Sequence, residues 1–159
     1  MMISSMEHIT KNLGETQELA KEWLASLGAL GAKSGGATLA GLVGDLGSGK
    51  TSFVQGVARS FGITESVTSP TFILERIYQI PKPDNQNLTT DNFSQLIHID
   101  AYRLEGASEL GHLGWDELAK DPGNLILVEW PERIFSPLPQ DMQILKFEFI
   151  DENTRKISF

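Results

Sequence analysis

The residues with the most specific chemistry form a glycine-rich run that fits the phosphate-loop pattern G-x-x-x-x-G-K-T. The run reads Gly44, Asp45, Leu46, Gly47, Ser48, Gly49, Lys50 and Thr51, and Ser52 follows it. Glycines at these positions let backbone N–H groups point at phosphate oxygens. In such a loop Lys50 reaches the β- and γ-phosphates, and the Thr51 hydroxyl ligates Mg²⁺. The run therefore predicts a nucleotide site that extends from Gly44 to Ser52.

The segments that flank this run have the order that a phosphate loop requires. Residues 37–43 are apolar and indicate a buried strand, whereas residues 52–61 indicate a helix that stops at Gly62. A helix that follows the loop directly adds the positive end of its dipole to the phosphate site. The glycine spacing, G-x-x-G-x-G, is not the dinucleotide fingerprint G-x-G-x-x-G. We therefore interpret residues 44–51 as a phosphate loop.

Two further strands are predicted to end in a carboxylate. Residues 96–100 and residues 124–129 are apolar runs that finish at Asp100 and Glu129. In an open α/β sheet, ligands bind beyond the carboxyl ends of the strands, and Mg²⁺ prefers hard oxygen ligands. We expect Glu129 in the metal shell and Asp100 as the catalytic or second metal-shell group, although the two roles could be exchanged.

Three other residues allow more than one interpretation. Thr71, in the run Ser69-Pro70-Thr71-Phe72, could be a switch residue that senses the γ-phosphate or part of a simple turn. His98 alternates with Asp100, so it is either packed in the core or bonded to that carboxylate. Trp130 could belong to a lid, to a stacking surface or to the core.

The remaining elements predict an α/β P-loop fold. Asn12 and Glu15 have capping-box spacing, and the helix that follows runs to Gly28. Its predicted inward stripe consists of Leu13, Leu19, Ala20, Trp23, Leu24 and Leu27. A strand is expected over 69–80, a mobile loop over 81–95, short helices over 108–120, and a hairpin from strands 143–150 and 154–159. The sum is one domain, 1–159, with a mostly parallel sheet in a three-layer arrangement and a C-terminal antiparallel hairpin.

Composition limits the possible functions. The 159-residue chain contains no cysteine and carries a net charge of −8, which is unfavourable for holding nucleic acid without a partner. No apolar run approaches the roughly 20 residues of a membrane helix, and the first residues lack the layout of a signal peptide. These features favour the cytoplasm and predict no membrane contact.

The nucleotide is expected to be ATP. Guanine recognition calls for an Asn-Lys-x-Asp motif, which the chain lacks, and Asp100 does not begin an Asp-x-x-Gly switch. Two other functions stay open. A small-molecule kinase would need a lid and an acceptor pocket, and a non-hydrolysing module would bind ATP only to gate its partners.

Four motifs in series resemble the bacterial TsaE (YjeE) family, the ATPase subunit of the machinery that makes threonylcarbamoyladenosine in tRNA. They are the phosphate loop at 44–51, Ser69-Pro70-Thr71-Phe72 with Tyr78, His98-Ile99-Asp100-x-Tyr102-Arg103-Leu104, and Glu129-Trp130-Pro131-Glu132. The resemblance implies a P-loop fold, Mg²⁺-dependent ATP hydrolysis, and association with the TsaD–TsaB heterodimer. Contact with tRNA would then be indirect, through that complex. We expect hydrolysis by the isolated chain to be slow, because no residue is an obvious arginine finger.

Roles for individual residues follow from the same resemblance. Lys50 and the loop amides hold phosphates, Thr51 and Glu129 serve Mg²⁺, and Asp100 lies on the γ-phosphate side. Thr16 corresponds to a position near the nucleotide base, and Trp130 matches a tryptophan beside the site. Two departures are visible, because Ser48 replaces a commoner alanine and the 81–95 loop is longer than usual.

Overall fold

The fold is built on a seven-stranded sheet with the order β1-β7-β6-β2-β5-β4-β3 in a computed structural model. The structure describes residues 5–29, 35–68, 74–82 and 93–159. The strands are β1 (Glu7–Thr10), β2 (Thr38–Val43), β3 (Glu75–Gln79), β4 (Gln95–Asp100), β5 (Asn124–Glu129), β6 (Gln143–Phe149) and β7 (Arg155–Ser158). The helices are α1 (Leu13–Ala29), α2 (Lys50–Ser60) and α3 (Trp115–Lys120), with 3₁₀ helices η1 (Ala107–Leu113) and η2 (Pro131–Arg133).

The centre of the sheet is parallel and its two ends are antiparallel. Strand β2 pairs in parallel with both β5 and β6, and β4 pairs in parallel with β5. Strand β3 is antiparallel to β4 at one end, and β6, β7 and β1 form antiparallel pairs at the other. Both the mostly parallel centre and the C-terminal hairpin were predicted from sequence and are confirmed. Strand β1 was missed, because four residues with no clean alternation carry too little pattern.

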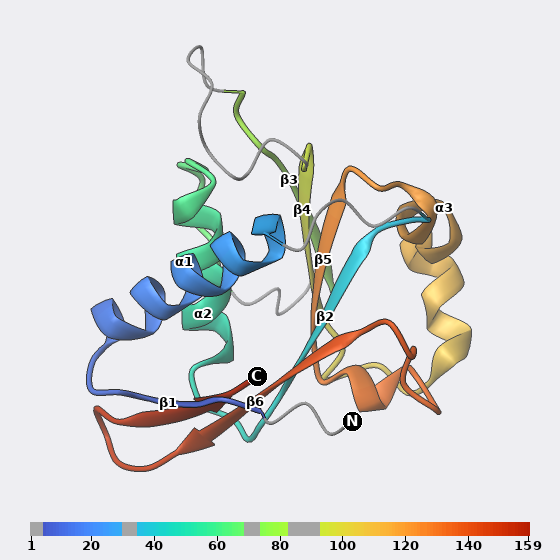
Figure 1. Ribbon diagram of the computed structural model, residues 1–159. Helices are drawn as coiled ribbons and strands as arrows, with labels where there is room; N and C mark the ends of the chain where they lie inside the picture. Colours follow the sequence, from blue (N-terminus) through green and yellow to red (C-terminus); the bar gives the residue numbers. More distant parts are fainter. Residues whose placement is uncertain (1–4, 30–34, 69–73, 83–92) are drawn as a thin grey trace.

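Helices cover both faces of the parallel strands, which gives the expected three layers. Figure 1 shows α1 and α2 on one side of the sheet and α3 on the other. The α1–α2 side buries Trp23, Phe53 and Leu127 in one apolar cluster, and the α3 side buries Ile126 and Val128 in a second. Side chains of β5 therefore alternate between two cores, because successive residues of a strand point to opposite faces. This double burial fixes where the carboxyl ends of the central strands lie.

Helix α1 begins as the capping spacing predicts. The Asn12 side-chain oxygen accepts a hydrogen bond from the backbone N–H of Glu15 at 2.8 Å. The Glu15 carboxylate accepts from the N–H of Lys11 at 2.7 Å, one residue earlier than a capping box requires. The predicted inward position of Leu13 is wrong, because its side chain is 56% exposed. Leu13 is the first residue of the helix, and it borders a cavity instead.

Some sequence predictions fall on residues outside the described ranges. Thr71 and most of the 81–95 loop belong to them, and the described part of the 69–80 strand begins at Glu75. Gln95, placed at the end of that loop, is instead the first residue of β4 because it pairs with Gln79 and Asn124. Within the described residues, no helix is long and apolar enough to span a membrane.

Candidate functional site

The glycine-rich loop connects β2 to α2 and is shaped by its glycines. Gly44, Gly47 and Gly49 have φ angles of 156°, 77° and 103°, which non-glycine residues rarely adopt. A Cβ atom on Gly44 would also overlap the carbonyl oxygen of Phe147 on β6. Gly49 caps α2 without a side-chain hydrogen bond. The first turn of α2 therefore presents backbone N–H groups that an anion can accept from.

Lys50 is buried and folded back onto the loop. Its Nζ donates to the backbone oxygens of Gly44 and Asp45, the latter at 2.8 Å, and lies 3.4 Å from the Ser48 hydroxyl. Burial lowers the pKa of Lys50, and the negative charges of Glu129, Asp100 and other carboxylates oppose that shift. An ammonium group whose hydrogen bonds in a desolvated site go to neutral oxygens is well suited to receive a phosphate.

Glu129 connects the loop helix to the sheet. Thr51 Oγ1 lies 3.2 Å and 3.4 Å from its two carboxylate oxygens, and His98 Nε2 lies 2.7 Å from Oε2. Glu129 is only 3% exposed and His98 is fully buried. The sequence allowed His98 to be packed in the core or bonded to Asp100; its side chain is packed in the core, and its hydrogen bond is to Glu129. The ring reaches the neighbouring strand β5, where Glu129 lies two residues beyond Leu127, the register partner of His98.

Asp100 and Glu129 occupy paired positions at the ends of neighbouring parallel strands. Residues in register on such strands point to the same face, here the face covered by α2. Asp100 is half-buried and its Oδ1 accepts a hydrogen bond from the N–H of Tyr102 at 3.0 Å. Both carboxylates line one cavity with Lys50 and Thr51. The sequence prediction that these four groups converge agrees with this geometry.

Trp130 follows Glu129 and has a backbone conformation that is rare for a non-glycine residue, with φ of 60°. Its N–H donates to the carbonyl of Leu42 at 3.2 Å, which ties this conformation to the end of β2. The half-buried indole lies 4.5 Å from Lys50 Nζ, and Tyr102 packs against its ring. The ring therefore borders the cavity beside the ammonium group, as a wall of the site and not as part of the deep core.

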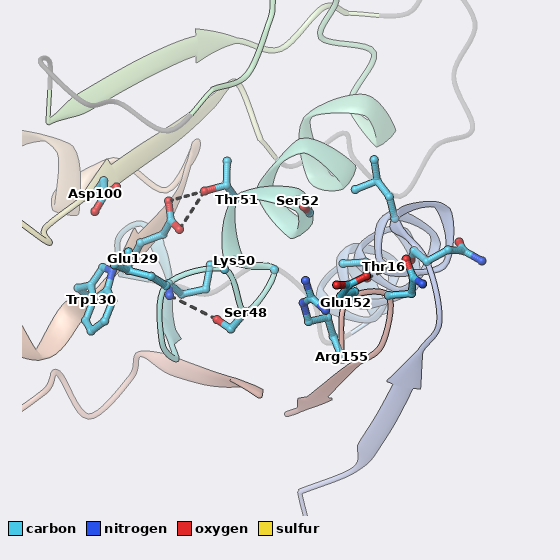
Figure 2. A pocket seen from close by; sticks show the side chains of 16 residues that line it. Thr16, Ser48, Lys50, Thr51, Ser52, Asp100, Glu129, Trp130, Glu152 and Arg155 are labelled. Carbon is cyan, nitrogen blue, oxygen red and sulfur yellow. Dashed lines mark hydrogen bonds between the residues drawn. The ribbon is translucent and has the colours of Figure 1, made fainter. Parts of the chain in front are cut away.

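The cavity has a volume of about 500 Å³ and extends well beyond the carboxylates. Figure 2 shows Asp100, Glu129 and Trp130 at one end, Lys50 and Ser48 near the middle, and Thr16, Glu152 and Arg155 at the other. Thr16 is buried, and its hydroxyl lies 2.7 Å from that of Thr10.

Most of the candidate residues named from sequence line this cavity. The exceptions are Gly44 and Asp45, which contribute only carbonyl oxygens to Lys50, and Thr71, which lies outside the described residues. Sequence reasoning missed Glu152, Asn153 and Arg155 of the β6–β7 turn. It predicted that hairpin but had no signal for the parallel pairing of β6 with β2, which brings the turn beside the loop.

The available oxygen donors fit a metal that arrives with a phosphate ligand. The Thr51 hydroxyl and the Glu129 carboxylate are in contact, and Asp100 is adjacent. The described residues contain no cluster of three or more His, Cys, Asp or Glu side chains that could hold an ion unaided. Mg²⁺ commonly takes one or two carboxylates and completes its shell with phosphates and water.

Comparisons with known proteins agree with this architecture. A family model described as "Threonylcarbamoyl adenosine biosynthesis protein TsaE" matches residues 10–157. The chain is 37% identical over 150 residues to the "tRNA threonylcarbamoyladenosine biosynthesis protein TsaE" of Bacillus subtilis, covering 94% of this chain and 82% of that protein. The TsaE protein of Rickettsia felis is 37% identical over 151 residues, covering 94% and 77% of the two chains. A crystal structure of Bacillus subtilis YdiB aligns with a TM-score of 0.64 and 28% identity, covering 100% of this chain and 86% of that one.

Proposed function

The chain belongs to the TsaE family, and on that premise we propose that it is an ATP-hydrolysing accessory subunit in the threonylcarbamoyladenosine modification of tRNA. Its partner in this proposal is the TsaD–TsaB heterodimer, which carries out the transfer itself. The tRNA is reached only through that complex, in keeping with a net charge of −8 on the chain. We place this activity in the cytoplasm.

The observation that carries the hydrolysis proposal is the contact between Thr51 and Glu129, with Asp100 in register beside them. A loop that only held a nucleotide would need the glycines and Lys50. The added pair of carboxylates supplies metal ligands and a base at the end of the cavity where a terminal phosphate would lie.

The proposed reaction is attack of water on the γ-phosphorus of ATP. The bond from water oxygen to phosphorus forms, and the bond from phosphorus to the bridging oxygen of the departing ADP breaks. Bound Mg²⁺ would supply charge neutralisation for the phosphates, with Thr51 and Glu129 as its protein ligands. Lys50 would exchange its loop carbonyls for the β- and γ-phosphates, and Asp100 would orient the water and accept its proton.

Slow turnover in isolation is part of the proposal. Among the described residues that line the cavity, the one arginine, Arg155, lies at the end away from Asp100 and Glu129. A cation positioned on the γ-phosphate is worth several orders of magnitude to related enzymes. A partner that rearranges the end of the cavity at Asp100 and Glu129, so that a cation is positioned there, would therefore raise the rate of ATP hydrolysis.

The function is tested by reconstituting threonylcarbamoyl transfer to tRNA with TsaD–TsaB. The expected result is sustained modification only when this chain and ATP are both present. Modification that continues undiminished without the chain would contradict the accessory role. A phosphorylated small molecule as the product of ATP consumption would indicate a kinase instead.

A further inference from the structure

An arginine stands behind the wall of the cavity that Trp130 forms. Arg133 is the last residue of η2, and its backbone N–H donates to the carbonyl of Trp130 at 3.0 Å, so the chain folds back on itself here. The guanidinium carbon of Arg133 lies 5.9 Å from the centre of the Trp130 ring. Lys50 Nζ lies 4.5 Å from the centre of the same ring. One indole therefore contacts both the phosphate-loop lysine and an arginine that does not line the cavity.

The Tyr102 ring is the second support of Arg133. The guanidinium carbon lies 5.5 Å from the centre of this ring, which packs against Trp130 with 5.1 Å between the two ring centres. The backbone N–H of Tyr102 donates to Oδ1 of Asp100 at 3.0 Å, so the ring belongs to the loop that carries this carboxylate. The ion pairs of the described residues do not include Arg133. Two aromatic rings therefore hold its guanidinium group, and such contacts are weak at exposed positions.

The backbone that carries Arg133 is fixed, whereas its side chain is not. Pro131 and Ile134, on either side of it in η2 and its cap, are buried. The side chains of Arg133 and Tyr102 are exposed. A new rotamer of Arg133 is therefore enough to move the guanidinium group off the rings, with no change in the fold. Figure 2 shows Trp130 beside Asp100 and Glu129, so the group starts next to the end of the cavity where a terminal phosphate would lie.

This end of the cavity has more anionic than cationic groups. The pKa of Lys50 is lowered by burial, and four carboxylates oppose that shift, the strongest being Glu129 and Asp100. A terminal phosphate adds further negative charge, which the transition state of phosphoryl transfer spreads over the γ-phosphate oxygens. A guanidinium group is always charged and its planar fork of donors fits a phosphate. Arg133 is adjacent to this end and has the chemistry that it lacks.

We propose that Arg133 is a catalytic residue of ATP hydrolysis, an arginine finger that the chain itself supplies. Its guanidinium group leaves the Tyr102 and Trp130 rings and donates hydrogen bonds to the γ-phosphate oxygens. Arg133 stays protonated throughout, so the bonds made and broken are those of the hydrolysis step given above. The assignment rests on the proposed function and identifies the cation that a partner positions. In the isolated chain the stacked position predominates, which accounts for slow turnover.

The first test uses the isolated chain. Tyr102→Leu removes one of the two rings but keeps apolar bulk, so Arg133 spends more time off the stack. Phosphate release from ATP should rise about two- to fivefold, the scale of one exposed cation–π contact. The gain should disappear when Arg133→Gln is combined with Tyr102→Leu. Tyr102→Phe is the matched control, because it keeps a ring beneath the guanidinium group and should show no gain.

The second test adds TsaD–TsaB. Arg133→Gln should lower the maximal stimulated rate roughly a hundredfold, because a cation on the γ-phosphate is worth several orders of magnitude. The heterodimer concentration that gives half of the maximal rate should stay the same. A role in docking would instead change that concentration and leave the maximal rate unaltered. Arg76→Gln, at an exposed position of β3, is the control and should behave as wild type.

The outcomes separate this proposal from the proposed function. No gain in a folded Tyr102→Leu variant would overturn it, and so would a gain that persists with Arg133→Gln or a maximal stimulated rate that Arg133→Gln leaves unaltered. If Tyr102→Leu fails to fold, the second test decides. If TsaD–TsaB does not stimulate wild type, the proposed partner is wrong and the first test decides.

Binding without hydrolysis is a further outcome that keeps the two claims apart. If wild type binds ATP without hydrolysing it, the hydrolysis claim is wrong, and calorimetric titration with ATP and with ADP decides on Arg133. Tyr102→Leu should then raise the affinity for ATP relative to ADP, because only ATP carries the γ-phosphate, and Arg133→Gln should cancel the gain. An unchanged ratio of the two affinities would overturn the assignment. Wild-type protein that binds neither nucleotide would overturn both claims.

Discussion

His98 Nε2 lies 2.7 Å from Oε2 of Glu129, and this contact joins two strands beneath the candidate site. The same carboxylate faces the hydroxyl of Thr51, so the imidazole and the loop helix hold it from two sides. Nδ1 of His98 is buried and has no hydrogen-bond partner in the described structure. We therefore assign the hydrogen to Nε2, from which it is donated to Glu129. A hydrogen on Nδ1 would lose this bond, which costs more than leaving Nδ1 as a buried acceptor without a partner. His98 is a positioning residue for Glu129.

Replacement of His98 should loosen Glu129. His98→Leu removes the donor and leaves a buried carboxylate with one fewer partner, which should cost about 1–3 kcal/mol of unfolding free energy. It should also raise the Mg²⁺ concentration needed for half-maximal ATP hydrolysis. His98→Gln, whose amide nitrogen can reach the position of Nε2, should recover much of both losses. Urea unfolding and a Mg²⁺ titration provide the readouts, and an unchanged Mg²⁺ requirement in His98→Leu would contradict a positioning role.

Substitutions of Glu129 and Asp100 are expected to differ in their effect on the Mg²⁺ requirement of ATP hydrolysis. Glu129→Gln keeps the shape of the side chain but removes its charge, so it should lower activity roughly a hundredfold while some nucleotide binding persists. Asp100→Asn should lower turnover with less effect on the Mg²⁺ requirement, because its proposed task is orienting water. Steady-state hydrolysis over a range of Mg²⁺ concentrations distinguishes the two variants. If Asp100→Asn changes the Mg²⁺ requirement more than Glu129→Gln does, the two roles are exchanged.

Trp130 should report on nucleotide binding. Its ring lies 4.5 Å from Lys50 Nζ, and a bound triphosphate would draw that ammonium group away from its present partners. ATP should therefore change the tryptophan fluorescence of the protein. Trp130→Phe should remove the change, whereas Trp115→Phe, which alters a ring packed on Phe135, should retain it. A change of the same size in Trp130→Phe would show that another tryptophan is the reporter.

Glu75 should make the protein less stable as pH rises. Burial raises its pKa above the ordinary value of 4.5, and its buried Oε2 has no partner among the described residues. In the pH interval from about 4.5 up to the raised pKa, the folded state binds more protons than the unfolded state. The contribution of Glu75 to stability is therefore present in acid and is lost as pH rises through that interval. Glu75→Gln should be more stable than wild type at neutral pH and should lose this advantage near pH 4.5.

Urea unfolding at several pH values measures that difference. Glu18→Gln, at an exposed position of α1, is the matched control and should leave the pH profile of wild type unchanged. A constant difference between Glu75→Gln and wild type across the range would exclude the titration of Glu75 as the cause.

The sequence predicted the chemical end of the site well because that end depends on local patterns. Apolar runs that finish at Asp100 and Glu129, together with the loop at 44–51, determine where three strand ends must meet. The contact of His98 with Glu129 depends instead on register between strands. Alternation along β4 indicates only that His98 and Asp100 lie on the same face of the strand. The alignment of β4 with β5 is needed to show that the Glu129 carboxylate lies close to His98.

The opposite end of the cavity could not be predicted for a related reason. Arg155 follows a hairpin turn that the sequence indicates clearly, yet hairpins of this kind occur in many places. Its position over Gly49 results from the pairing of β6 with β2. That pairing joins segments about a hundred residues apart, for which periodicity contains no information. Strand β1, which closes the same end of the sheet, was missed because its four residues carry too little pattern of their own.

Phosphate release from ATP tests the central claim most directly. It is measured for the purified chain alone and with TsaD–TsaB, beside the variants Lys50→Ala and Lys21→Ala. We expect slow release alone, faster release with the heterodimer, and loss of both in Lys50→Ala, because the buried ammonium group is the phosphate ligand of the loop. Lys21 is exposed on α1 and should tolerate the substitution. Release that persists in Lys50→Ala, or no release in either setting despite ATP binding, would contradict the account.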